Sequence, residues 1–207
     1  METKLQQQLA GHHLVKVEDP HFIIDLMYAR NENMSGQNVY QQIGFGNQAY
    51  VHPDVYAKML ALIPELEAHG YKMRIGDAYR PPIAHTELVR IVPIPGFFKA
   101  DYRTSNHCHA TAIDVCLTDL HGNNLAYPTE MDAYTPEIAQ AAAQGNFEPL
   151  QANLVKARHD YMEAASEQIA NRQYLKELME RYGFLSIPHE WWHYNLAGFE
   201  NYPVVEI

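Results

Sequence analysis

The sequence has little cysteine, a deficit of basic residues and no long apolar run. It contains 2 cysteines, and 15 Lys and Arg stand against 25 Asp and Glu among 207 residues, giving a formal net charge of −10. Two cysteines are too few for the disulfide framework of a small secreted domain. The acidic balance argues against nucleic acid or an anionic membrane surface as a partner, because both favour basic patches.

No apolar stretch approaches the roughly 18–20 residues that are needed to cross a bilayer. The N-terminus, Met1 to Ala10, is polar and rich in Gln. It has neither the apolar segment nor the small-residue cleavage site of a signal peptide. We therefore expect a soluble, cytoplasmic protein. The length suits one domain, and we expect residues 1–20 to form a lead-in and residues 21–207 a single domain. The sequence leaves the oligomeric state open.

Apolar periodicity and turn residues predict the elements of this domain. A helix is predicted from Pro53 to Gly70, with Pro64 kinking or splitting it. A further helix is predicted at 83–91, the region 151–182 is predicted to be helical, and strands are predicted at 22–24, 73–75, 112–117 and 191–195. This order favours an α+β fold, with a central, mainly antiparallel sheet flanked by helices.

Two separate clusters carry residues that bind metals. The first contains Ser105, His107 and Asp114, and the second is Glu190-Trp191-Trp192-His193. Zinc readily takes neutral imidazole nitrogen and carboxylate oxygen, and three protein ligands with one open position are typical of a catalytic site. His107 and Asp114 can converge if His107 enters a strand from which Asp114 points inward. Spacing alone also allows ordinary surface or core histidines.

Glu190 lies three residues before His193. Positions three apart on a regular strand face opposite sides of the sheet. A bulge, or a place for Glu190 just before the strand, would bring both side chains into one pocket. Glu190 would then be a base for a metal-activated water. We expect the two intervening tryptophans to shield this edge, at least one of them as part of the core.

Cys108 and Cys116 flank the first cluster. A tetrahedral structural zinc site usually brings a close pair of cysteines separated by two residues, which this sequence lacks. We therefore expect both to be reduced thiols packed near a strand, and not metal ligands.

The two clusters together resemble the motifs of the zinc D-alanyl-D-alanine dipeptidases, the VanX-type branch of the M15 metallopeptidases. The similarity extends in order from about residue 20 to the end of the chain. The other blocks that resemble this family are Tyr28 with Asn33-Met34-Ser35-Gly36, Gly76-Asp77-Ala78-Tyr79-Arg80-Pro81, Thr129-Glu130-Met131-Asp132, and Asn171-Arg172 with Leu175, Met179 and Gly183-Phe184.

The resemblance implies a role for each matching position. It implies one zinc ion per chain, in a cleft, held by His107, Asp114 and His193. Glu190 would be the general base, and Arg80 would stabilise the charge that develops on the scissile carbonyl oxygen. The residues that would line the pocket and hold the termini of a short peptide are Tyr28, Ser105 and Asp132.

The sequence departs from the family pattern beside His107. Where the family usually has Arg and Gly, this chain has His109 and Ala110. If position 110 adopts a positive φ, alanine there costs about 1 kcal/mol. His109 lies two residues from His107, so on an extended segment it would face the same way and could contact metal or substrate.

The sequence therefore predicts zinc-dependent hydrolysis of a small dipeptide with a D-residue, D-alanyl-D-alanine foremost, in the turnover of cell-wall precursors. One alternative is a zinc D,D-carboxypeptidase or L,D-endopeptidase acting on peptidoglycan peptides, which an open groove would favour over a closed pocket. The other is a non-catalytic zinc-binding module, whose mark would be the loss of the base or of the oxyanion group. Glu190 and Arg80 are both present.

Overall fold

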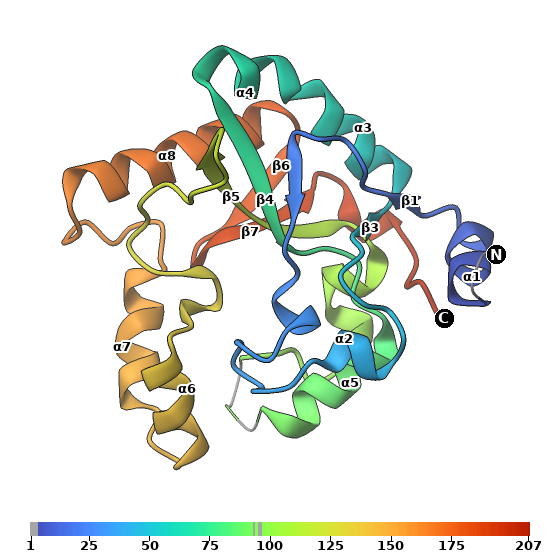
Figure 1. Cartoon of the computed structure of the whole chain (residues 1–207), viewed down its shortest axis with the longest axis horizontal. Coiled ribbons are helices and arrows are strands. Elements are labelled where there is room, and N and C mark those ends of the chain that lie inside the picture. The colour runs from blue at the N-terminus through green and yellow to red at the C-terminus, as the bar shows by residue number, and fades with distance from the viewer. Residues whose placement is uncertain (1–3, 93, 95–96) are drawn as a thin grey trace.

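The chain forms a mixed α+β fold around a central sheet, as the sequence predicts (Figure 1). The computed structural model describes residues 4–92, 94 and 97–207. Helices α3, α4 and α8 lie on one side of the sheet in Figure 1, and α2, α5, α6 and α7 lie on the other.

The bounds of the elements agree with most of the predicted ones. The strands are β1 (Val15–Lys16), β2 (Phe22–Ile24), β3 (Tyr50–Val51), β4 (Tyr71–Asp77), β5 (Ala112–Asp119), β6 (Phe184–Ile187) and β7 (Glu190–Leu196). The helices are α1 (Lys4–Gly11), α2 (Val39–Gln42), α3 (Pro53–Ala61), α4 (Ile63–His69), α5 (Pro82–Ile91), α6 (Pro136–Ala143), α7 (Glu148–Lys156) and α8 (Ser166–Arg181). Short 3-10 helices lie at Met27–Ala29, Tyr102–Thr104, Asn106–His109, Met131–Ala133 and Phe199–Asn201.

The large sheet has five strands in the order β2-β4-β5-β7-β6. Strand β2 runs parallel to β4, and every other neighbouring pair is antiparallel. The middle strand, β5, is buried along all but its last residue, Asp119. Residues on both faces of β5 are therefore buried: Ile113, Val115 and Leu117 on one face, and Asp114, Cys116 and Thr118 on the other. Strands β1 and β3 form a separate two-stranded sheet.

The helical region that begins at Pro53 is split at the predicted proline. Helix α3 ends at Ala61, and α4 begins at Ile63 with Pro64 in its first turn. Proline has no backbone N–H and fits the start of a helix better than its interior. Gly70 then ends α4 with a φ of 68°, a conformation that glycine adopts without strain.

The N-terminal segment does more than lead into the domain. Strand β1 pairs with β3, with Val15 opposite Val51. The side chains of Leu9, Leu14 and Val17 are buried in the core. The described part of residues 1–20 therefore packs against the domain.

The prediction of a continuous helical region at 151–182 is only partly right, because α7 ends at Lys156 and α8 begins at Ser166. The apolar stripe predicted on α8 is buried at Leu175, Leu178 and Met179, and Gly183 follows it with a φ of 89°. At 16 residues, α8 is the longest helix in the described part of the chain. Within that part, no helix is both long enough and apolar enough to span a membrane.

Candidate active site

Two carboxylates and one imidazole lie in a row across the middle of the large sheet. Asp77 on β4 is opposite Asp114 on β5, and Asp114 is opposite His193 on β7. Directly opposed residues on antiparallel strands project from the same face. A register shift between Ile75 and Asp77 sets Asp77 in this row. Strand pairing therefore brings together residues that are far apart in sequence.

His107 approaches this row from the turn that precedes β5. It lies in the 3-10 helix Asn106–His109, which ends at Ala110. Nε2 of His107 lies 3.2 Å from Nδ1 of His193 and 3.4 Å from Oδ2 of Asp114. Nδ1 of His193 lies 3.0 Å from Oδ1 of Asp114. The three residues are buried, and one potential ligand atom from each lies within 4.8 Å of the others.

The remaining ring nitrogens fix the orientation of both imidazoles. Nδ1 of His107 donates a hydrogen bond to the carbonyl oxygen of Ala78 at 2.8 Å, and Nε2 of His193 donates to Oδ1 of Asn195 at 3.0 Å. In the neutral tautomers, Nε2 of His107 and Nδ1 of His193 therefore present lone pairs toward each other and toward a carboxylate. Metal-binding histidines usually donate their other N–H in this way. The donor set fits a divalent metal of the zinc type.

We call His107, Asp114 and His193 the metal-binding triad. The charges around this triad agree with a cation site. Burial by itself raises the pKa of Asp114, but His107 and His193 hold it well below its usual range. Burial lowers the pKa of His193, and Asp114 overcomes this effect through a hydrogen bond and its charge, raising the pKa to about 9. The Asp114 carboxylate is thus ionised and stabilises positive charge beside it.

Glu190 reaches the same site through a bulge in β7. Ser186 on β6 is opposite Tyr194, but the next residue, Ile187, is opposite Glu190. The extra residues on β7 break the regular alternation of faces. As a result, Oε2 of Glu190 lies 3.9 Å from Nδ1 of His193. The bulge is one of the two arrangements that the sequence analysis offers for bringing Glu190 and His193 into one pocket.

Arg80 is buried beside the triad and is held by Asp77. Its Nε and Nη2 donate to Oδ2 of Asp77 at 2.9 and 2.6 Å. Asp77 also accepts hydrogen bonds from the Tyr40 hydroxyl, at 2.6 Å, and from the backbone N–H of Ala78, at 3.0 Å. These contacts fix the guanidinium at one edge and leave its Nη1 edge directed toward His85.

His85 supports the other edge of Arg80. Its Nε2 donates to the carbonyl oxygen of Lys99 at 2.8 Å, and its Nδ1 lies 3.5 Å from Nη1 of Arg80. Burial and then the charge of Arg80 lower the pKa of His85 to about 4. The ring is therefore neutral near pH 7, and its Nδ1 presents a lone pair to the guanidinium.

Tyr28 and Asp132 form a second buried polar pair at the site. The hydroxyl of Tyr28 donates to Oδ2 of Asp132. Burial, and then the charge of Asp114, raise the pKa of Asp132 to about 7. Asp132 has a φ of 56°, which is uncommon for a residue other than glycine. The Tyr28 ring also lies beneath Arg80, whose guanidinium carbon is 5.1 Å from the ring centroid.

A single cavity of about 420 Å³ contains all the site residues that the sequence predicts. Its lining also includes aromatic and polar residues to which the sequence analysis assigns no role, among them Phe98, Asn106 and Asn195. The predicted residues that line it are Tyr28, Arg80, Ser105, His107, Asp114, Asp132, Glu190 and His193.

The two tryptophans beside Glu190 have different surroundings. Trp191 is 1% exposed, stacks on Tyr127 with ring centroids 4.0 Å apart, and donates from Nε1 to the Thr129 hydroxyl at 2.9 Å. Trp192 is 2% exposed and lines the site cavity. One tryptophan is therefore a core residue, and the other is a wall of the site.

His109 does not reach the metal-binding triad. Its Nδ1 lies 2.7 Å from the carbonyl oxygen of Tyr202 and its Nε2 lies 2.9 Å from that of Arg103. Both ring nitrogens are thus used to hold the C-terminal segment and the preceding loop. His109 is also not among the described residues that line the site cavity, so the prediction that it could contact metal or substrate is not supported. Ala110 does adopt a positive φ, 56°.

Neither cysteine belongs to the triad. Cys108 and Cys116 are buried free thiols. Burial raises the pKa of each to about 12. A thiol that is protonated at neutral pH is a poor metal ligand and a weak nucleophile, which agrees with the prediction of packed, reduced cysteines.

Three residues that hold the site side chains in place have no role in the sequence analysis; they are Asn195, Asp77 and His85. Asn195 lies two residues after His193 on one strand, so period-two alternation already placed both on one face. Asp77 lies within the segment that contains Arg80, but only the register shift in β4 turns it into the site. His85 carried no signal, because its contact with Arg80 depends on the fold of the loop around Lys99.

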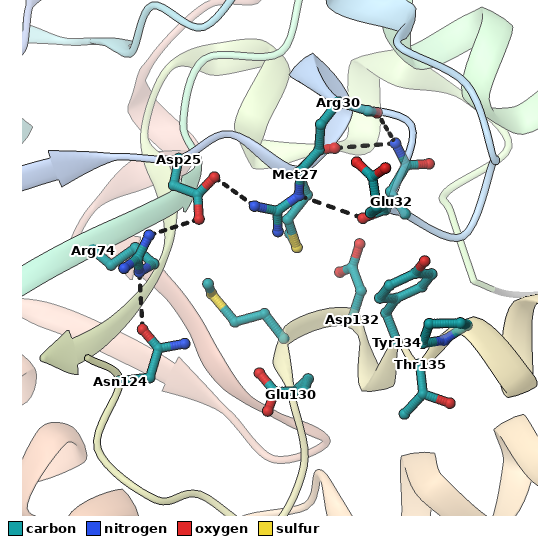
Figure 2. Close-up of a pocket in the computed structure, with 13 residues that line it drawn as sticks. Asp25, Met27, Arg30, Glu32, Arg74, Asn124, Glu130, Asp132, Tyr134 and Thr135 are labelled. Atoms are coloured by element: carbon teal, nitrogen blue, oxygen red, sulfur yellow. Dashed lines mark hydrogen bonds and ion pairs between the residues drawn. The ribbon is translucent and has the colours of Figure 1, made fainter. Parts of the chain in front are cut away.

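Asp132 also lines a second pocket, of about 280 Å³, shown in Figure 2. Asp25 lies between two arginines there, accepting from Arg30 at 2.5 Å and from Arg74 at 2.7 Å. Arg74 also donates to Asn124 at 2.8 Å. These pairs link β2, β4 and the turn after β5, and so fix the segment that leads to Tyr28.

Comparisons with known proteins agree with this geometry. The family model described as D-ala-D-ala dipeptidase, peptidase M15, matches residues 9–204. The chain is similar to the D-alanyl-D-alanine dipeptidase of Escherichia coli (strain K12), with 31% identity over 186 residues, which cover 90% of this chain and 84% of the relative.

Proposed function

The chain belongs to the peptidase M15 family of D-ala-D-ala dipeptidases, and we propose that it is a zinc dipeptidase that hydrolyses D-alanyl-D-alanine or a closely related D-residue dipeptide. The observation that carries the proposal is the cavity of about 420 Å³, which gathers three metal-binding side chains, a carboxylate and a guanidinium. We also propose that the protein is cytoplasmic, as the sequence analysis predicts.

His107, Asp114 and His193 would hold one zinc ion through Nε2, a carboxylate oxygen and Nδ1. When bound, zinc polarises a peptide carbonyl and lowers the pKa of water to about 7. Asn195 and the carbonyl of Ala78 keep the two imidazoles in the tautomers that this binding requires.

Glu190 is the general base in this proposal. Its carboxylate lies 3.9 Å from Nδ1 of His193, and its side chain is 28% exposed, so water reaches it. Glu190 takes a proton from the attacking water and passes it to the amine that leaves. General acid–base catalysis of this kind contributes roughly 100- to 10,000-fold to the rate.

Arg80 would stabilise the negative charge that develops on the carbonyl oxygen. The bonds to Asp77 and the contact with His85 hold the guanidinium in one orientation before the reaction starts. A charge that is oriented in advance stabilises the transition state without reorganisation. Burial in the cavity wall strengthens this effect, because water does not screen the charge.

Tyr28, Asp132 and Ser105 would hold the termini of the dipeptide. An ionised Asp132 would pair with the ammonium group of the substrate, and the Tyr28 hydroxyl orients this carboxylate. Ser105, which lines the cavity beside His107, offers a hydroxyl to the carboxylate terminus. Because one cavity offers partners for both charged termini of the substrate, it favours a dipeptide over a longer peptide.

The first test is the release of D-alanine from D-alanyl-D-alanine by the zinc-loaded protein, beside Glu190→Ala. We expect release by the wild type and a loss of nearly all turnover in the variant, with zinc retained. Release from larger peptidoglycan peptides only would favour the carboxypeptidase or endopeptidase alternative. Zinc binding without hydrolysis of any D,D or L,D peptide would favour a binding module.

A further inference from the structure

A largely apolar groove, distinct from the pocket of Figure 2, adjoins the site cavity. It encloses about 430 Å³ between the side chains of Ile94 and Phe97, helix α7 and the turn before β7. Gln151, Arg158, His189 and Glu190 are its polar lining residues among those described. The apolar residues that line it are Ile94, Phe97, Phe147, Leu150, Leu154 and Val155.

The groove and the site cavity lie side by side and share part of their walls. Phe97, Leu154, His189 and Glu190 line both. Glu190, the proposed base, thus lies at the boundary between the two, next to any ligand bound at the proposed metal site. The site cavity alone already falls in the range of roughly 300–1,000 Å³ that small-molecule pockets occupy, so the groove provides room beyond that needed by two alanines.

The position of Glu190 tells which end of a dipeptide faces the groove. In the proposed reaction, Glu190 gives its proton to the leaving amine, which belongs to the C-terminal residue of the substrate. Tyr28, Arg80 and Asp132 line the site cavity but are not among the described residues that line the groove. The N-terminal ammonium therefore lies away from the groove, and the C-terminal residue lies next to it.

The chemistry of the groove suits an apolar side chain. Val155 is 54% exposed, so its methyl groups are free to contact a ligand. The guanidinium of Arg158 is already paired with Asp160, through contacts of 2.8 Å at Nε and at Nη2. The six apolar lining residues offer no side-chain hydrogen bond, so peptide main chain buried against them would lose its hydrogen bonds to water.

We propose that this groove is the subsite for a large apolar side chain on the C-terminal residue of the dipeptide. The inference rests on the proposed function and narrows its substrate class to D-residue dipeptides that end in an apolar residue such as phenylalanine or leucine. Burial of an aromatic side chain in such a groove adds binding energy beside the leaving amine.

The test compares D-Ala-D-Phe with D-Ala-D-Ala as substrates of the zinc-loaded protein. We expect the wild type to hydrolyse D-Ala-D-Phe with a kcat/KM roughly 10-fold higher. Val155→Trp fills the groove with an indole, and we expect it to lower the ratio of the two kcat/KM values roughly 10-fold. Leu185→Trp is the matched control, because Leu185 is 46% exposed on β6 and is not part of the described groove lining; its ratio should equal that of the wild type.

The other outcomes separate the inference from the proposed function. Hydrolysis of D-Ala-D-Ala with a ratio that Val155→Trp leaves unchanged would reject the subsite and leave the proposed function standing. If Val155→Trp instead slows hydrolysis of D-Ala-D-Ala-D-Ala alone, the groove holds peptide main chain, and the inference is wrong. Release of an amino acid from neither dipeptide would reject both the reaction and the subsite. Calorimetric titration of D-Ala-D-Phe into zinc-loaded Glu190→Gln, with and without Val155→Trp, provides a readout that needs no turnover: an equal Kd in both proteins would also reject the subsite.

Discussion

Nε2 of His193 donates a hydrogen bond of 3.0 Å to Oδ1 of Asn195, two residues further along β7. The same oxygen accepts a hydrogen bond of 2.7 Å from Nδ2 of Asn106, which precedes His107. One amide thus links the turn that carries His107 to the strand that carries His193. The link fixes both imidazoles relative to each other before any metal binds.

Replacing this amide tests its role in the metal site. We expect Asn195→Leu to lower zinc affinity roughly 10- to 100-fold, because nothing then fixes the tautomer and ring orientation of His193. Competition with a chelator measures the affinity. Asn195→Asp retains an acceptor oxygen and should lose less. Equal zinc affinity in Asn195→Leu and the wild type would show that the strand alone positions His193.

Removing a metal ligand should abolish stabilisation by zinc. A ligand that binds only the folded state, present at about 1,000 times its Kd, stabilises it by about 4 kcal/mol. We expect zinc to raise the Tm of the wild type, and a chelator to reverse the rise. His193→Ala should lose this response. His121→Ala removes an exposed histidine from a turn and should retain it. A full zinc response in His193→Ala would overturn the ligand assignment.

Arg80→Lys keeps the positive charge but changes its geometry. A lysine ammonium cannot contact Asp77 and the carbonyl oxygen with the fixed fork of a guanidinium. We expect kcat to fall roughly 100- to 1,000-fold with a smaller change in KM, because the lost contact is made mainly in the transition state. Steady-state kinetics on D-alanyl-D-alanine measure both. Arg90→Lys, at an arginine 68% exposed in its side chain, is the control and should behave as the wild type. A change in KM alone would instead indicate that Arg80 binds the ground state.

The raised pKa of Asp132 predicts how the stability of the metal-free protein depends on pH. The pKa is about 7 in the folded state, against 3.8 for an ordinary aspartate. Between these values the folded state holds a proton that the unfolded state has lost, so Asp132 makes the fold less stable as pH rises from about 4 to about 7. Asp132→Asn removes this dependence and retains an acceptor for Tyr28.

Thermal unfolding of the two metal-free proteins over this pH range measures the effect. The Tm of Asp132→Asn relative to the wild type should increase up to about pH 7 and then level off. The control is Asp101→Asn, because Asp101 is a surface carboxylate whose pKa is lowered by hydrogen bonds from Arg103. A constant difference in Tm between Asp132→Asn and the wild type would mean that Asp132 is ionised throughout.

Much of the fold followed from local signals. Pro64 splits a helix where the sequence places it, since proline cannot continue the hydrogen bonds of a helix interior. The strand predicted at 112–117 is present, since all of its residues except Asp114 are apolar, which suits a strand that is buried on both faces. The break between α7 and α8 was missed, because residues 157–165 show no strong turn signal and leave the helix for contacts distant in sequence. Among these, the N–H of His159 bonds to the carbonyl of Pro188 at 3.0 Å.

For the site, the sequence by itself determined which chemical groups are present. The motifs around His107, Asp114, Glu190 and His193 identified the family, and residue type fixes what each side chain can donate, accept or bind. Only the tertiary structure decided their arrangement. The pairing of β5 with β7 sets Asp114 opposite His193, and the bulge turns Glu190 to the same face. The pairing of Asp114 with His193 joins residues 79 positions apart, and its register depends on the packing of the whole sheet, which no local pattern contains.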